Sequence, residues 1–189
     1  MINQVWSAIL LCLILLAAGR CLAVADDGNV ATRYSLGSSL GITYDPSADV
    51  DFILLSAAAL YDYEAIWHHR APDPLRFKVE GHVGSTTGTH MSTVASANIL
   101  ALYFLDHFTS AHLRPYLEAG IGIIYTDFQV EGQGLRVNFN PQAGVGMEMD
   151  WSDGAPWFSA LRLHHVSNGG LHHDNRGINS VVLQVGRFF

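Results

Sequence analysis

Hydrophobic and polar residues alternate along much of the chain with a period of two. The alternation is clearest at 138–151 and recurs at 33–44, 75–83 and 116–125. In the clearest segment, the apolar face comprises Phe139, Pro141, Ala143, Val145, Met147, Met149 and Trp151. Because successive side chains of a strand point to opposite faces, each segment predicts a strand with one apolar and one polar face. Pro141 lies inside this pattern and predicts a bulge or a local defect in its strand.

Less regular runs bring the expected number of strands to eight. They lie at 51–64, 91–106, 157–167 and 178–189. The regular segments are long for strands of a globular protein, but their length suits a strand that crosses a bilayer at a tilt. Eight is also the smallest usual strand number for an outer-membrane barrel. We therefore expect an all-β fold, an eight-stranded antiparallel up-and-down transmembrane β-barrel.

The alternative is a soluble barrel of lipocalin type, with its apolar faces turned inward around a ligand. Three features favour the membrane. Glycines gather on the polar faces, where a narrow barrel has little room. The chain ends in Phe188-Phe189, which resembles the assembly signal of outer-membrane barrels. The polar faces also collect more charges than a ligand cavity would hold: Arg33, Arg76, Lys78, Glu80, Glu118, Glu148, Asp150 and Arg162.

Aromatic residues fit the same topology. If the first strand starts in the periplasm, four of them fall near the periplasmic ends of strands, where an aromatic girdle is expected. They are Trp67, Trp151, Trp157 and Phe189.

The first twenty-five residues have the features of a secretory signal peptide. Ala8 to Ala18 forms an apolar core, and Ala23-Val24-Ala25 supplies a small-x-small cleavage site. We therefore expect residues 1–25 to be removed and residues 26–189 to form the barrel. Both cysteines lie in the removed segment, so cysteine chemistry and disulfides are excluded for the mature chain.

Composition excludes several other classes of protein. The chain is 49% hydrophobic and 14% charged, and its formal charge is −7. Such a chain lacks the basic face of a nucleic-acid binder, and it is too apolar for a disordered protein. No apolar run reaches the roughly 18 residues of a membrane-spanning helix. A mean hydropathy of +0.20 then means that the apolar residues are spread over short segments.

The candidate chemistry lies between residues 162 and 179. His165 and Ser167 are two residues apart on the seventh strand, so they share a face, and alternation makes it the lipid-facing one. Polar side chains are costly against hydrocarbon unless they have a function. Side by side, they match the base and the nucleophile of a serine hydrolase. The alternative is that both lie at headgroup level, where polar residues are tolerated.

The surrounding motif resembles a known family. His165-x-Ser167-Asn168-x-x-Leu171, followed by Asn175-x-Gly177-Ile178 and a last strand that ends in Phe, is similar to the PagL-type lipid A 3-O-deacylases. The resemblance implies an eight-stranded outer-membrane acyl hydrolase without metal or organic cofactor. It implies that Ser167 attacks the 3-position ester, that His165 acts as base, and that Asn175, with help from around Asn168, stabilises the oxyanion.

The sequence departs from this family at one position. The family's catalytic acid is a glutamate, and Asn179 stands in its place. An asparagine can orient a histidine, but it cannot stabilise the imidazolium by charge. Asp174 is the nearest carboxylate in sequence and is a candidate substitute. If neither Asn179 nor Asp174 serves, the chain is an inactive relative of the family or one with a different function.

Topology places this motif at the outer leaflet of a Gram-negative outer membrane. The seventh strand runs outward, so His165, Ser167 and Asn179 lie near the level of lipopolysaccharide, the expected substrate. We therefore expect outer-membrane lipids to surround the barrel, and we expect no nucleic-acid partner. The sequence leaves open both a homodimer and a non-enzymatic structural barrel.

Metal ligands are scarce on any one face. His164 and His165 point to opposite faces of their strand, so they do not bind one ion together. His172, His173 and Asp174 carry donor groups for zinc or nickel. We nevertheless expect no metal site.

Overall fold

Nine strand segments build the wall of the protein. The computed structural model describes residues 30–46, 50–88, 90–151 and 154–189, so the predicted signal peptide at 1–25 lies outside the described residues. The elements are β1 (Arg33–Asp45), β2 (Phe52–Asp62), α2 (Tyr63–Trp67), β3 (Leu75–Thr86), β4 (Thr93–Phe104), the 3-10 turn η1 (Asp106–Phe108), β5 (Leu113–Thr126), β6 (Val137–Phe139), β7 (Gln142–Met149), β8 (Trp157–Val166) and β9 (Ile178–Phe188).

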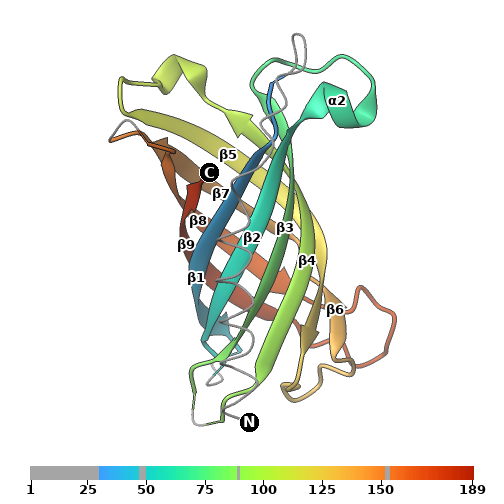
Figure 1. Cartoon of the computed structure of the whole chain (residues 1–189). Helices are drawn as coiled ribbons and strands as arrows, with labels where there is room; N and C mark the ends of the chain where they lie inside the picture. Colours follow the sequence, from blue (N-terminus) through green and yellow to red (C-terminus); the bar gives the residue numbers. More distant parts are fainter. Residues whose placement is uncertain (1–29, 47–49, 89, 152–153) are drawn as a thin grey trace.

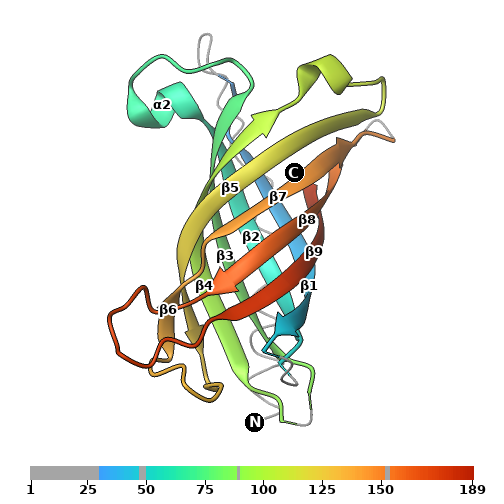
Figure 2. The same ribbon diagram turned by 180° about the vertical axis from the view of Figure 1, so that it is seen from behind.

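The segments close into a barrel (Figures 1 and 2). Strands adjacent in the barrel pair antiparallel, and β9 returns to pair with β1. Both β6 and β7 pair with β5, so they are two parts of one strand that is interrupted at Asn140-Pro141. Proline has no backbone N–H to donate to the ladder, which explains the interruption. The predicted eight-stranded antiparallel barrel and the predicted defect at Pro141 are both confirmed.

The interior is filled in three layers. A cluster that includes Leu102, Phe104 and Phe158 fills the end nearest α2, which we call the helix end. A second cluster, including Leu54, Ile124 and Val166, fills the opposite end, which we call the site end. Between them lies an ionic belt made of Lys78, Glu80, Glu118 and Arg162. All four of these charged side chains are buried.

Arg162 is the centre of the ionic belt. Its guanidinium donates to Glu118 at 2.6 Å and to Glu80 at 2.7 Å, and its side chain is only 2% exposed. Lys78 makes a second ion pair with Glu118. Gln184 donates to the other oxygen of Glu80 at 2.6 Å. The charges therefore satisfy one another, as charges buried away from water must.

Gly144 on β7 makes room for this arginine. A Cβ at residue 144 would lie 2.3 Å from the carbonyl oxygen of Leu161 and 2.9 Å from both Cα and Cγ of Arg162, so the close approach of β7 to β8 at this arginine requires glycine.

The outer wall is apolar, which excludes the lipocalin-type alternative. Large exposed side chains cover the barrel's outside, whereas the interior holds the charges. Asp150 is a correction to the predicted set of interior charges, because it is exposed. The reason is that β7 ends at Met149, so alternation no longer dictates where the next side chain points.

The four aromatic residues of the predicted girdle all lie at one end of the barrel, the helix end. Trp67 belongs to α2 and packs edge-on against Phe77, with 5.6 Å between ring centroids. Trp157 opens β8, and Trp151 and Phe189 follow the ends of β7 and β9. Among the residues described, no helix combines the length and the apolar character needed to span a bilayer.

The ionic belt generates the first prediction. Replacing Arg162 with Met leaves two buried carboxylates facing a single lysine, so we expect the free energy of unfolding to fall by about 3–5 kcal/mol. Denaturant titration of the refolded barrel in detergent measures this change. Arg136→Met is the matched control, because the Arg136–Asp127 pair is exposed at the site end and should contribute nothing measurable. Equal stabilities of the two variants would contradict a structural role for the ionic belt.

Candidate active site

His165 and Ser167 lie on the outer face at the end of β8. Val166, between them, is buried in the interior cluster of the site end, so alternation points its two neighbours outward. The backbone N–H of His165 donates to Pro141 at 3.0 Å, and Ser167 pairs with Phe139 through two backbone hydrogen bonds. Both residues are therefore fixed on the interrupted strand β6–β7. In Figure 2 the loop that follows β8 lies beside β6, at the end opposite α2.

A row of three side chains crosses adjacent strands at this level. His165 on β8 stands opposite Asn179 on β9, and Asn179 stands opposite Asp45 on β1. His165 Nδ1 and Asn179 Oδ1 are 2.6 Å apart, and Asn179 Nδ2 donates to Asp45 Oδ2 at 2.9 Å. We call these three residues the polar row. Directly opposed residues on neighbouring strands are within contact distance, which is how the barrel assembles the row.

A bulge in β1 aims Asp45 at the row. The pairing of β1 with β9 is regular up to Thr43 and Ser180, and then shifts, so that Asp45 rather than Tyr44 stands opposite Asn179. Such an extra residue commonly re-aims a side chain next to a functional site. The other oxygen of Asp45 accepts from Arg176 in an ion pair. A carboxylate thus supports Asn179.

The carboxylate suggested by sequence proximity lies elsewhere. Asp174 is exposed and contacts His172 and His173, through a backbone hydrogen bond of 3.1 Å and a side-chain pair of 3.3 Å. Donor atoms of these three residues lie within 4.8 Å of one another. The cluster does not include a member of the polar row, so Asp174 is not the carboxylate behind His165.

The loop between β8 and β9 is organised by Asn168. Its side chain is fully buried. Its Oδ1 accepts from Gly170 N–H at 2.9 Å, and its Nδ2 donates to the carbonyl of Asp174 at 2.7 Å. Gly169 and Gly170 both have positive φ, which lets the chain turn here. The amide of Asn168 is therefore engaged in holding the loop.

Asn175 is fixed by the same arrangement. The backbone N–H of Asn168 donates to Asn175 Oδ1 at 2.7 Å. This bond orients the Asn175 amide and leaves its Nδ2 hydrogens available to donate to another group. Asn175 is exposed, so that group can be external.

Two hollows flank the polar row. An outward-facing groove of about 300 Å³ is lined by His165 and Asn179 together with apolar side chains. The apolar side chains are Tyr44, Pro141, Ala143 and Leu163, and Leu163 is 61% exposed on the barrel's outer wall. Gln142 and His164 complete the lining.

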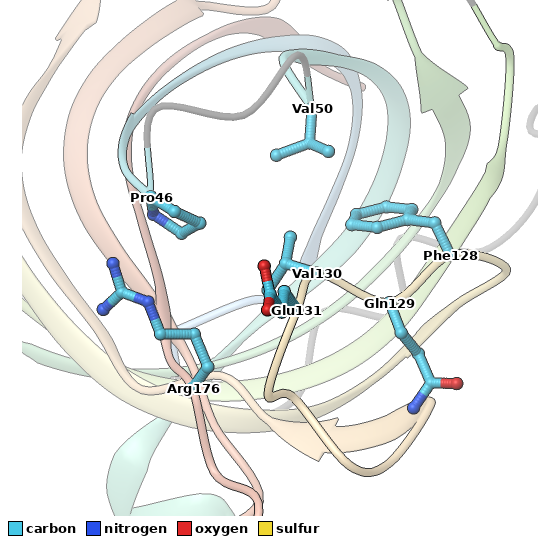
Figure 3. A pocket seen from close by; sticks show the side chains of 7 residues that line it. All are labelled: Pro46, Val50, Phe128, Gln129, Val130, Glu131 and Arg176. Carbon is cyan, nitrogen blue, oxygen red and sulfur yellow. The ribbon is translucent and has the colours of Figure 1, made fainter.

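The second hollow is a recess of about 480 Å³ between loops at the site end (Figure 3). Arg176 and Pro46 lie on one side of it and Phe128 on the other. Arg176 therefore belongs both to the recess and to the ion pair behind Asn179.

His164 faces the interior and is separate from the site. It contacts Asn140 at 3.4 Å, and its ring packs edge-on against Phe52. His164 and His165 thus point to opposite faces, as predicted.

The structure brings His165 and Asn179 together more tightly than His165 and Ser167. Within the described part of the chain, no hydrogen bond joins the Ser167 hydroxyl to His165. The hydrogen bond between a nucleophile and its base often tightens only when substrate binds. Without substrate, the observation that bears on this pair is that Ser167 and His165 lie on the same face of the barrel.

Comparisons with known proteins show a family match. A family model described as lipid A 3-O-deacylase (PagL) matches residues 55–187, which contain the motif on β8 and β9 but not Asp45. The lipid A deacylase PagL of Pseudomonas aeruginosa is 31% identical over 81 residues, which are 42% of this chain. That alignment spans 46% of the Pseudomonas protein, less than half of its length.

Solved structures show the same fold. The crystal structure of the outer membrane enzyme PagL aligns with a TM-score of 0.57 and 19% identity, over 80% of this chain and 97% of that one. Neisserial surface protein A aligns with a TM-score of 0.62 and 13% identity, over 83% and 95%. At these identities the likeness concerns the barrel alone.

Gly177 generates the second prediction, because it lies against the ring of His165. A Cβ at residue 177 would be 2.6 Å from His165 Cε1. We expect Gly177→Ala to displace the imidazole and to lengthen its hydrogen bond to Asn179. The ¹⁵N ring resonances of His165 report this change.

Gly81→Ala is the control for that variant, since a Cβ there meets only one atom, at 3.9 Å. Unchanged His165 resonances in Gly177→Ala would show that the ring tolerates a methyl group at this position.

Proposed function

Since the chain belongs to the lipid A 3-O-deacylase (PagL) family, we propose that it is a serine esterase that removes the acyl chain ester-linked at the 3-position of lipid A. The protein is located in the outer membrane, as its family and its barrel indicate. The proposal further includes removal of residues 1–25 as a signal peptide on export.

One observation carries the proposal: the polar row faces outward from an apolar wall. Polar groups in such a place are costly unless they serve a function. The row lies near the ends of β8 and β9, on the side of the wall that faces lipid, so a membrane lipid meets it sideways. Lipid A occupies the outer leaflet, at the level of the site end if the helix end faces the periplasm. The apolar groove beside His165 then suits a fatty acyl chain.

The reaction follows the logic of a serine hydrolase. His165 Nε2 takes the proton of the Ser167 hydroxyl while Oγ attacks the ester carbonyl carbon. The tetrahedral intermediate collapses, and the C–O bond to lipid A breaks. The imidazolium gives its proton to the departing 3-hydroxyl oxygen. Water, deprotonated by His165, then attacks the acyl-serine and releases the fatty acid and free Ser167.

Asn179 serves as the orienting residue of this mechanism. Its Oδ1 accepts from Nδ1–H of His165, which leaves Nε2 unprotonated and directed to the nucleophile. An amide carries no charge to stabilise the imidazolium. We therefore expect slower turnover than with a glutamate at this position.

Asn175 donates to the oxyanion in this scheme. The backbone N–H of Asn168 donates to its Oδ1, and this bond fixes the amide without using the Nδ2 hydrogens. Asn168 contributes by holding this loop, since its own amide donates to a backbone carbonyl. Donors fixed in advance stabilise charge as it develops, without reorganisation during the reaction.

The third prediction tests the activity. Refolded protein incubated with lipid A should release one ester-linked acyl chain, seen by mass spectrometry, and Ser167→Ala should release none while its barrel stays folded. Ser38→Ala is the matched control, because Ser38 is an exposed serine on β1 that lies away from the polar row. Unchanged lipid A from well-folded wild-type protein would favour the non-enzymatic barrel.

The fourth prediction concerns the oxyanion. Asn175→Ala should lower kcat by about 10²–10³-fold and leave KM nearly unchanged, since the donor acts mainly in the transition state. His173→Ala serves as control, because His173 is exposed in the same loop. A fall in kcat of equal size in both variants would indicate general disruption of the loop instead.

A further inference from the structure

We propose that Asp45 is a positioning residue that acts through Asn179 to hold His165 in the tautomer that accepts the serine proton. The inference rests on the proposed esterase function and adds a residue that lies outside the segment matched by the family model. Asp45 touches neither Ser167 nor the groove in the structure, so its effect is transmitted by the Asn179 amide.

The chemistry of hydrogen bonding supports this role. An asparagine amide has one accepting and one donating end, and it can turn over to exchange them. An ionised carboxylate only accepts. Asp45 therefore holds the NH₂ end of Asn179 toward itself, and the Oδ1 end must face His165. The atom facing Oδ1 must then be a donor, so Nδ1 carries the proton and Nε2 is free to act as base.

Without Asp45, this selection is lost. The amide is then free to turn its NH₂ toward Nδ1, which would favour the tautomer with the proton on Nε2. That tautomer cannot accept the serine proton. A glutamate at residue 179 would need no such partner, because both of its oxygens accept. With Asp45 beside it, Asn179 presents only an accepting oxygen to His165, as a glutamate at this position would without a partner.

Geometry and charge agree with orientation as the main effect. The bulge at Tyr44–Asp45 places the carboxylate opposite Asn179 instead of one position away. Arg176 pairs with the second carboxylate oxygen and so fixes Asp45. It also offsets the negative charge, which leaves little of it to stabilise the imidazolium. An alternative role for the Asp45–Arg176 pair is to fasten β1 to the loop before β9.

A crossed set of variants separates these two roles. In the wild-type background, Asp45→Ala should lower kcat about 10- to 100-fold with KM nearly unchanged, as loss of an orienting partner does. In the Asn179→Glu background, Asp45→Ala should not lower kcat, because the introduced glutamate orients His165 unaided and loses a like-charged neighbour. Asp127→Ala is the matched control, since Asp127 also pairs with an arginine at the site end but does not contact the polar row.

A second measurement does not depend on activity. In protein labelled with ¹⁵N-histidine, two-bond couplings identify which ring nitrogen of His165 carries the proton, and His165→Gln assigns the signal. We expect the Nδ1–H form in the wild type and a substantial Nε2–H population in Asp45→Ala. The signal in Asp127→Ala should match the wild type.

The outcomes distinguish the two proposals. Folded wild-type protein that leaves lipid A intact would overturn the proposed function, while the tautomer measurement would still test Asp45. Active wild-type protein whose Asp45→Ala variant keeps both its kcat and its Nδ1–H form would overturn the role of Asp45 alone. An equal fall in kcat in the wild-type and Asn179→Glu backgrounds, with the tautomer unchanged, would also overturn this role. The Asp45–Arg176 pair would then serve to fasten β1 to the loop before β9.

Discussion

The mutual neutralisation of the charges inside the barrel is the constraint on which the rest of the structure depends. Arg162 holds Glu80 and Glu118 at the centre, and Lys78 completes the ionic belt. Apolar clusters fill the barrel on both sides of this belt. Among the residues that the structure describes, side chains fill the interior of this narrow barrel from end to end. The polar row accordingly lines a groove on the outer wall, not a cavity inside the barrel.

A site on an apolar outer wall has to satisfy its own polar groups. Water is scarce there, so each donor and acceptor needs a partner within the protein or the substrate. The polar row meets most of this need internally, because each residue bonds to the next across β8, β9 and β1. In the proposed mechanism, Nε2 of His165 finds its partner in the hydroxyl of Ser167. At its end the row is joined by the ion pair of Asp45 to Arg176, which lies in the loop before β9. Barrel closure is essential to it, since only closure brings β1 beside β9.

Much of the fold followed from alternation along the sequence, because the period of two reports directly which face of a strand is buried. Alternation also predicted that His165 and Ser167 face outward, and the presence of a proline inside a regular strand predicted the defect at Pro141. It was wrong for Asp150, which lies just past the end of its strand. Alternation carries information only as far as the strand continues.

The part of the site that could not be predicted depends on long-range register. Asp45 lies 134 residues from Asn179, and a bulge shifts its pairing by one position. Closure of an eight-stranded barrel would have placed the end of the first strand near the start of the last one. It would not have shown which residue faces Asn179. The bonds that engage the Asn168 amide are a property of the folded loop, and no sequence pattern reports them.

The most direct test of the account is chemical capture of its nucleophile. A long-chain alkyl fluorophosphonate should form one covalent adduct with the refolded protein, and peptide mass mapping should locate it on Ser167. The rate of capture should fall sharply in His165→Gln, since the base is lost. Absence of an adduct on Ser167, or capture at an unchanged rate without His165, would contradict a lipid-facing serine esterase site on this barrel.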